Sequence, residues 1–133
     1  MSADVAYLDT SAVVKLLMRE RETAALRRDL RRWPRRASSG LLRVELLRAI
    51  KRAGLPRLSA PAQRHLAAIS LIRMDDALLD RAGDLDPASL RSLDAIHLAS
   101  ALALGSDLGV VVSYDDRMLR GAAALGLRTA SPR

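Results

Sequence analysis

Two short apolar segments, each followed by acidic residues, constrain most strongly how this chain can fold. The first runs from Val5 to Asp9 and reads VAYLD, and the second runs from Gly109 to Ser113 and precedes Asp115 and Asp116. Continuous apolar runs of this length are typical of strands buried on both faces of a parallel sheet. Parallel strands end at one edge of their sheet, where α/β proteins bind ligands. The sequence therefore predicts a cluster of acids at that edge.

Helical patterns fill the chain between these strands. Helices are expected over residues 12–18, 22–32, 41–53, 59 or 60 to 68, 75–83 and 92–104, and a last helix is expected to end at residue 125. Further strands are expected over 36–38, 69–73 and 127–129. Ser38 or Ser39 is available to cap the helix over 41–53, and Gly54 follows its end. Strands alternating with helices predict an α/β fold, a three-layer α/β/α sandwich with a central parallel sheet, in one domain over residues 1–133.

The composition narrows the possible functions. The chain has no Cys, which excludes disulfides, thiolate zinc sites and cysteine nucleophiles and favours a reducing compartment, the cytoplasm. It has 22 Lys and Arg against 15 Asp and Glu, and this net charge of +7 predicts attraction to RNA, DNA or an acidic partner. Aromatic residues make up 2% of the chain, too few for a surface on which bases stack. No apolar run is long enough for a signal sequence or a membrane span, so we expect no membrane association.

Two of the notable acids follow strands. Asp9 comes directly after the first apolar run, and Asp115 comes two residues after the second. Both should therefore project at the same edge of the sheet. An alternative for Asp9 is a turn that ends the strand, with Thr10 and Ser11 as ordinary turn residues, and Asp115 has a similar alternative.

Two further acids are expected on helices. In the helix over 41–53, Glu45 lies at the edge of the apolar stripe, where core meets cleft; the alternative is a surface acid paired with Arg48. Asp94 begins a long segment without other Asp, Glu, Lys or Arg residues, and the alternative is that it only caps that helix.

If these carboxylates converge, their mutual repulsion must be relieved by protons or by a cation between them. An all-oxygen ligand set without Cys favours Mg²⁺ or Mn²⁺ over zinc. Such a cation also binds phosphate, lowers the pKa of a bound water and neutralises charge that develops on phosphate oxygens. In a basic chain this arrangement indicates phosphodiester hydrolysis.

Four segments of the chain carry a resemblance to a known family. They read YLDTSAVVKLL at residues 7–17, RVELLRA at 43–49, LRSLDAIHLASAL at 90–102, and VVSYDDRML at 111–119 with AAALGL at 122–127. In this order they closely resemble the PIN domain and, more narrowly, the VapC-type ribonuclease toxins of bacterial VapBC toxin–antitoxin systems. The resemblance covers essentially the whole chain. Its most specific parts are the Asp-Thr-Ser of the first segment and the Leu-Asp-Ala-Ile-His-Leu-Ala of the third.

The resemblance implies which acids form an active site. The family's four acids match, in order, Asp9, Glu45, Asp94 and Asp115. Asp9, Asp94 and Asp115 would hold one or two metal ions. Glu45 would complete the site or position the attacking water.

The resemblance also implies a role for neighbouring residues. The family's hydroxyls match Ser11 and Ser113, which would orient the carboxylates or bound waters. Asp116 is an alternative to Asp115 as the fourth acid. With Asp115 in that role, Asp116 is expected to cap the helix that follows.

The activity that the resemblance implies is a Mg²⁺- or Mn²⁺-dependent endoribonuclease that blocks translation until a VapB-type antitoxin binds. Such a toxin would form a homodimer, and its products would carry a 5′-phosphate and a 3′-hydroxyl. The alternative is a non-catalytic RNA-binding or regulatory PIN-like module, which should lack one of the four acids. A haloacid-dehalogenase-like phosphatase is disfavoured because it needs a second Asp two residues after Asp9, where this chain has Ser11.

Two other features have simpler interpretations. His97 lies one turn after Asp94, and because Mg²⁺ prefers oxygen ligands we expect His97 to pack or hydrogen-bond within the helix layer. The arginine-rich run RRDLRRWPRR at residues 27–36 is interpreted as a solvated face, or as a contact for a phosphate backbone or an acidic antitoxin segment.

Overall fold

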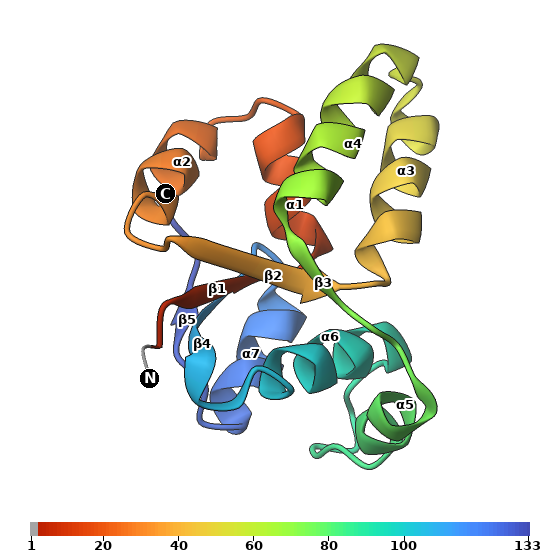
Figure 1. Cartoon of the computed structure of the whole chain (residues 1–133), viewed down its shortest axis with the longest axis vertical. Helices are drawn as coiled ribbons and strands as arrows, with labels where there is room; N and C mark the ends of the chain where they lie inside the picture. The colour runs from red at the N-terminus through yellow and green to blue at the C-terminus, as the bar shows by residue number, and fades with distance from the viewer. Residues whose placement is uncertain (1–2) are drawn as a thin grey trace.

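Five parallel strands form a sheet between two layers of helices (Figure 1). The structure is a computed structural model and describes residues 3–133. The strands are β1 (Val5–Leu8), β2 (Arg35–Ser39), β3 (Ser70–Ile72), β4 (Leu108–Val112) and β5 (Thr129–Ala130). Their order across the sheet is β3-β2-β1-β4-β5, and every pairing is parallel. The first strand of the chain is therefore the central one.

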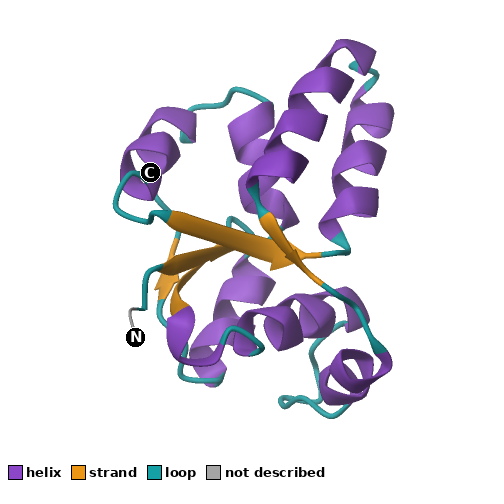
Figure 2. Ribbon diagram, in the orientation of Figure 1, coloured by secondary structure: helices purple, strands orange, loops and turns teal. Residues whose placement is uncertain are grey.

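Helices cover both faces of this sheet (Figures 1 and 2). One face is covered by α1 (Thr10–Leu17), α2 (Thr23–Leu30), α3 (Leu42–Ala53) and α4 (Ser59–Ala68), with the short 3-10 helix η1 (Pro56–Leu58) between α3 and α4. The other face is covered by α5 (Asp76–Gly83), α6 (Ser92–Leu102) and α7 (Asp116–Ala124), with the 3-10 helix η2 (Gly105–Asp107) before β4. This arrangement confirms the predicted three-layer α/β/α sandwich.

Alternate residues of the central strands enter the two helix layers. On β1, Ala6 and Leu8 pack with helices α1 to α4, whereas Val5 and Tyr7 pack with α6 and α7. All four side chains are almost fully buried. Because both faces are covered, these strands carry continuous apolar runs instead of alternating polar residues.

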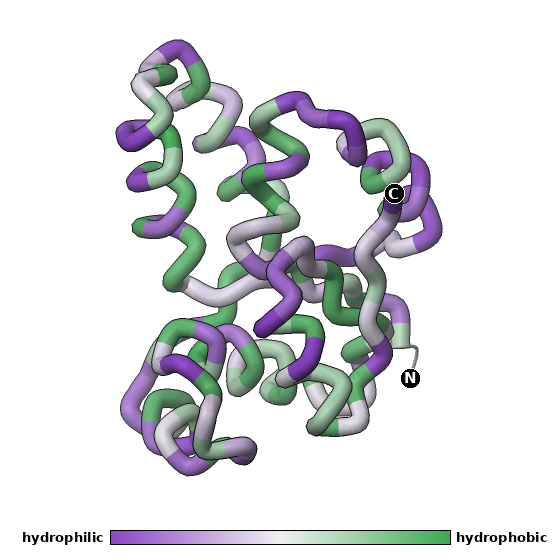
Figure 3. The backbone as a smooth tube through the Cα atoms, turned by 180° about the vertical axis from the view of Figure 1, so that it is seen from behind, coloured by the Kyte–Doolittle hydropathy of each residue, from purple (hydrophilic) through white to green (hydrophobic). Residues whose placement is uncertain are grey.

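The helices bury one apolar stripe each, which is visible along α3 as alternating hydrophilic and hydrophobic residues in Figure 3. On α3 the buried residues are Leu42, Leu46 and Ile50, spaced by one turn. The helix ends at Gly54, whose φ of 66° lies in the left-handed region that glycine adopts without a steric penalty.

The predicted cap of α3 is wrong. Neither Ser38 nor Ser39 is the N-cap, because β2 continues through Ser39 and pairs with β3 there. The N-cap position is Leu41, which makes no side-chain capping bond, and its backbone N–H donates to Ser39 Oγ at 3.1 Å.

The ends of several elements differ from the expected ranges by one or two residues. The last strand is an example, since 127–129 was expected and β5 covers Thr129–Ala130. The turn after α7 extends through Gly126, which has a φ of 77°, and pairing with Val111 and Val112 begins only at Thr129. Among residues 3–133, no helix has the length and apolar character needed to cross a bilayer.

We expect Gly109→Ala to destabilise the sheet. A Cβ atom there would lie 2.2 Å from Trp33 Cζ3 and 2.4 Å from the carbonyl oxygen of Ala3. The chain must shift to relieve both contacts, so the free energy of unfolding should fall by about 1–3 kcal/mol in urea titrations. Gly83→Ala is the control, because nothing lies within 4 Å of a Cβ at that position. It should change stability by at most about 0.5 kcal/mol, and equal effects of the two substitutions would contradict this account.

Candidate active site

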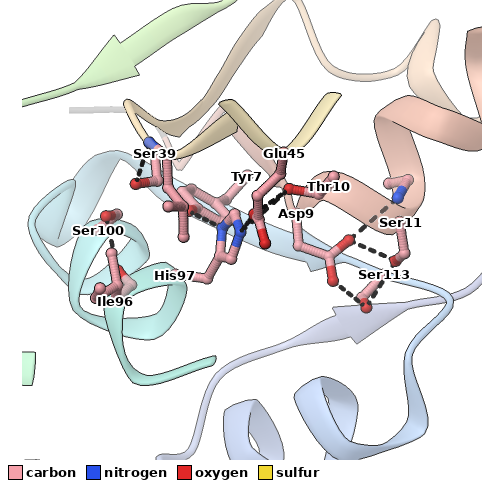
Figure 4. Close-up of polar contacts among 12 residues, drawn as sticks. Tyr7, Asp9, Thr10, Ser11, Ser39, Glu45, Ile96, His97, Ser100 and Ser113 are labelled. Carbon is pink, nitrogen blue, oxygen red and sulfur yellow. Dashed lines mark hydrogen bonds and ion pairs between the residues drawn. The ribbon is translucent and has the colours of Figure 1, made fainter. Parts of the chain in front are cut away.

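The carboxylate of Asp9 is the most buried acid of the site. Asp9 follows β1 and is the N-cap of α1, and the residue is 5% exposed. Its Oδ1 accepts hydrogen bonds from Ser11 Oγ at 2.6 Å and from the backbone N–H of Ala12 at 3.1 Å. Its Oδ2 accepts a bond from Ser113 Oγ at 2.6 Å (Figure 4). The capping bond to Ala12 is therefore only one of three contacts that hold this side chain.

Burial dominates the electrostatics of Asp9. It raises the pKa of the carboxyl above its ordinary value, although the hydrogen bonds from Ser11 and Ser113 oppose this shift. The hydrogen bonds therefore offset only part of the cost of burying the negative charge of Asp9. A nearby cation would stabilise this charge further.

Glu45 lies beside this carboxylate, on the first turn of α3. Its partners are not Arg48 but Thr10 and His97: Oε1 accepts from Thr10 Oγ1 at 2.5 Å and lies 2.9 Å from His97 Nε2. Burial opposes ionisation of Glu45, but the hydrogen bonds from His97 and Thr10 outweigh it and lower the pKa of the carboxyl. Glu45 is thus held as an oriented anion.

His97 connects the two helix layers at the end of the sheet (Figure 4). His97 packs in the layer of α6 and α7, as expected, where it is 4% exposed and contacts Tyr7, but it also bonds Glu45 in the opposite layer, which was not expected. Its ring lies 2.7 Å from Tyr7 Oη through Nδ1 and reaches Glu45 on α3 through Nε2. Burial raises the pKa of Tyr7 far above its ordinary value, so the phenol stays protonated and can donate a hydrogen bond to Nδ1. In the matching tautomer of His97, Nε2 carries the hydrogen and donates a hydrogen bond to Glu45.

Asp94 and Asp115 form the other half of the site. Asp94 lies in the first turn of α6, whose N-cap is Arg91, so it does not cap the helix. Burial raises the pKa of Asp94, and the charge of Asp115 raises it further. These two carboxylates are therefore close enough to repel each other.

Asp115 also caps the helix α7, a role that was predicted for Asp116 from the sequence. It is the N-cap of α7, and its Oδ1 accepts a hydrogen bond from the backbone N–H of Arg117 at 2.9 Å. Asp116 is the first residue of that helix, so the prediction that Asp116 caps it is wrong. The backbone N–H of Asp115 donates to Ser113 Oγ, which in turn bonds Asp9. The strand that ends at Val112 positions this chain of contacts.

The structure thus brings the four predicted acids to the carboxyl end of β1 and β4 without joining them into a finished coordination set. Across residues 3–133, no three His, Cys, Asp or Glu side chains are arranged so that they could already hold a metal ion. The donor chemistry nevertheless fits a hard divalent cation, because every candidate ligand is a carboxylate oxygen. The raised pKa values of Asp9 and Asp94 fit it as well, because burial, and for Asp94 also the charge of Asp115, disfavours the ionised carboxylates that a cation would favour.

Sequence reasoning missed two residues of this site, Tyr7 and Thr10. Thr10 was expected only as a turn residue, yet it bonds Glu45, which is 35 positions away. The signal available was position: Tyr7 and Thr10 flank the end of β1, where any polar atom lies near the acids. Their partners were not readable from one sequence.

The fold and the site together indicate the class of protein: an α/β sandwich with carboxylates at the ends of the parallel strands β1 and β4. The family model of the PIN domain matches residues 6–124, and the chain belongs to this family.

Comparison with curated proteins places it among the VapC-type members of that family. The chain is 50% identical over 126 residues to Ribonuclease VapC46 of Mycobacterium tuberculosis (strain ATCC 25618 / H37Rv), with 95% of this chain and 96% of the relative covered. It is 41% identical over 130 residues to Ribonuclease VapC47 of Mycobacterium tuberculosis (strain CDC 1551 / Oshkosh), with the same coverage. Ribonuclease VapC35 is 40% identical over 137 residues.

The hydrogen bonds of His97 predict a specific cost for removing its ring. In His97→Leu, the buried Tyr7 hydroxyl loses its acceptor and Glu45 loses a donor, so the free energy of unfolding should fall by about 2 kcal/mol or more. His65→Leu is the control, since His65 on α4 is only half-buried and should change stability by about 0.5 kcal/mol or less. Chemical denaturation measures both, and a negligible loss in His97→Leu would show that this network contributes nothing to the fold.

The raised pKa of Asp9 predicts how stability depends on pH. A carboxyl whose pKa is higher folded than unfolded binds its proton more tightly when folded, so the folded state loses stability as pH rises through that range. Asn cannot ionise, and the stability of Asp9→Asn relative to the unsubstituted protein should therefore increase between about pH 3 and pH 7.

Urea unfolding at several pH values tests this, with Asp75→Asn as a control for a lost capping carboxylate. Asp75 is the N-cap of α5 and is exposed. A relative stability of Asp9→Asn that fell with rising pH would contradict the assignment of Asp9 as an uncompensated buried acid.

Proposed function

We propose that this protein is an endoribonuclease that hydrolyses RNA phosphodiesters with a bound Mg²⁺ or Mn²⁺ ion. The observation that carries the proposal is the buried Asp9 carboxylate, which Ser113 connects to the backbone of Asp115, whose charge in turn raises the pKa of Asp94. A divalent cation would favour the ionised form of acids that burial and mutual repulsion disfavour. The names of the relatives, all ribonucleases, support RNA as the substrate, and the net charge of +7 supports a polyanion.

Asp9, Asp94 and Asp115 would hold the metal. When bound, the cation would supply an activated water and neutralise charge on the phosphate. Ser11 and Ser113 lock the Asp9 carboxylate in one orientation through two short hydrogen bonds. This fixed geometry removes the need to order the side chain during the reaction.

Glu45 would orient the attacking water. Thr10 and His97 hold its Oε1, which leaves Oε2 available to accept a hydrogen bond from that water. Attack on phosphorus would break the bond to the leaving 3′ oxygen, so the products would carry a 5′-phosphate and a 3′-hydroxyl.

The biological role that we propose is that of the toxin in a type II toxin–antitoxin pair, acting in the cytoplasm and inhibiting translation by cleaving RNA. Its partners would be a VapB-type antitoxin and a second copy of the chain. The VapC names of the relatives support this role. So do Val44 and Leu47 on α3, two large apolar side chains that are 61% and 37% exposed and would be covered by a partner.

The purified protein should cleave RNA when Mg²⁺ or Mn²⁺ is present and stop when the ion is chelated. Asp9→Asn and Asp94→Asn should each reduce the rate by about 100-fold or more, because each removes a charge that would hold the metal. Asp76→Asn, on the exposed surface of α5, is the control and should cleave at the unsubstituted rate.

Gel assays on total cellular RNA, followed by mapping of the cut ends, provide the measurement. Cleavage that survives in both variants would indicate a contaminating nuclease or another site. RNA binding without cleavage at any metal concentration would favour the alternative, a non-catalytic PIN-like module.

A further inference from the structure

A hollow between α7 and residues 87–90 carries two arginines that form no ion pair in the described part of the chain. It has a volume of about 430 Å³ and is lined by Ser89, Leu90, Arg117, Arg120, Gly121 and Ala124 together with Pro87. Within residues 3–133, neither the Arg117 nor the Arg120 guanidinium forms an ion pair. Both residues are exposed. The hollow therefore presents two free positive charges to solvent.

Part of the arginine-rich run around α2 is already engaged, since Arg35 pairs with Asp4 and Asp107, and Arg32 pairs with Asp29. Arg117 and Arg120 form no such pair within residues 3–133. What sets them apart from the other arginines without an ion pair is their place, because they line a hollow and Arg117 lies two residues after Asp115.

The shape of the hollow follows from the sequence of α7. Positions 117, 120, 121 and 124 share one face of the helix because they are three, four and seven residues apart. The small residues Gly121 and Ala124 line the hollow together with the two arginines. A Cβ atom at Gly121 would lie 2.8 Å from Leu90 Cδ2, so this glycine allows the turn at residues 87–90 to pack directly on α7.

The hollow adjoins the proposed active site. The backbone N–H of Arg117 donates to Asp115, and the Arg117 guanidinium acts on Asp94, where it partly offsets the effects of burial and of Asp115 on the pKa of that carboxyl. A strand of RNA with one phosphate at the acids would pass its neighbouring phosphate over Arg117 and Arg120.

We propose that this hollow is a binding site for a backbone phosphate of the RNA next to the phosphate that is cleaved. The inference rests on the proposed function and adds a subsite to it. Guanidinium groups bind phosphate through paired N–H donors. No aromatic side chain lines the hollow, so it lacks a surface for base stacking and holds the backbone instead. Binding there would be independent of sequence.

The test compares two double variants that lose the same charge. Arg117→Gln/Arg120→Gln removes the two arginines of the hollow. Arg57→Gln/Arg64→Gln removes two exposed arginines from η1 and α4, which lie in the helix layer on the other face of the sheet from α7 (Figure 1). For the α7 variant, KM for RNA cleavage should rise about tenfold with kcat nearly unchanged, because a contact made equally in ground and transition states is lost.

The salt dependence of binding gives a second measurement. Fluorescence anisotropy with a labelled single-stranded RNA, in EDTA to prevent cleavage, should show a plot of log affinity against log salt that is flatter by about 0.7 for the α7 variant, the contribution of one phosphate contact. The η1–α4 variant should keep the slope of the unsubstituted protein.

Three outcomes would overturn the subsite. An equal loss of RNA affinity in the two double variants would show that the attraction is spread over the surface. If a polyglutamate peptide at equal charge concentration displaced RNA from the unsubstituted protein but not from the α7 variant, the hollow would be assigned to acidic peptides. If the unsubstituted protein neither bound nor cut RNA, the proposed function itself would fail, whereas cleavage with an unchanged KM in the α7 variant would reject only the subsite.

Discussion

The burial of one carboxylate, that of Asp9, is the constraint on which the rest of this structure depends. An acid that is 5% exposed at the end of the central strand must find hydrogen-bond donors inside the protein. Ser11 is two positions away, but Ser113 is 104 positions away and comes from the strand beside β1. The carboxylate is therefore satisfied only when β1 and β4 are paired in the observed register. Folding of the sheet and assembly of the site are one event.

A second network ties the helix layers together at the same edge. Tyr7 points into the layer of α6 and α7, while Glu45 comes from α3 on the opposite face. His97 meets both, so the ring closes the end of the sheet and orients Glu45 at once. The parallel sheet makes this possible, because only beyond the strand ends can side chains from the two layers touch.

The sequence predicted well what depends on local pattern. Apolar runs revealed the strands, helical periodicity revealed the helices, and both strand-end acids lie at the expected edge. It failed where a contact decides between equivalent local choices. Asp115 and Asp116 are both suited to cap α7, and the hydrogen bond from the Arg117 backbone shows that Asp115 does so. Ser38 and Ser39 both resemble a cap for α3, but both belong to β2 and pair with β3. The bond between Glu45 and His97 joins residues 52 positions apart and has no local signature.

The contrast between an acidic site and a basic chain limits how an RNA phosphate could be accommodated. Surface charges are screened over about 8 Å at physiological ionic strength, so arginines farther away than that can attract a polyanion but cannot cancel repulsion at Asp9, Asp94 and Asp115. That repulsion must be removed locally, by protons or by a cation. Burial raises the pKa of Asp9 and Asp94, and the charge of Asp115 raises that of Asp94 further, so a proton and a cation would compete for the same carboxylate oxygens. Under the proposed function, the bound cation would relieve at close range the repulsion that distant arginines cannot reach.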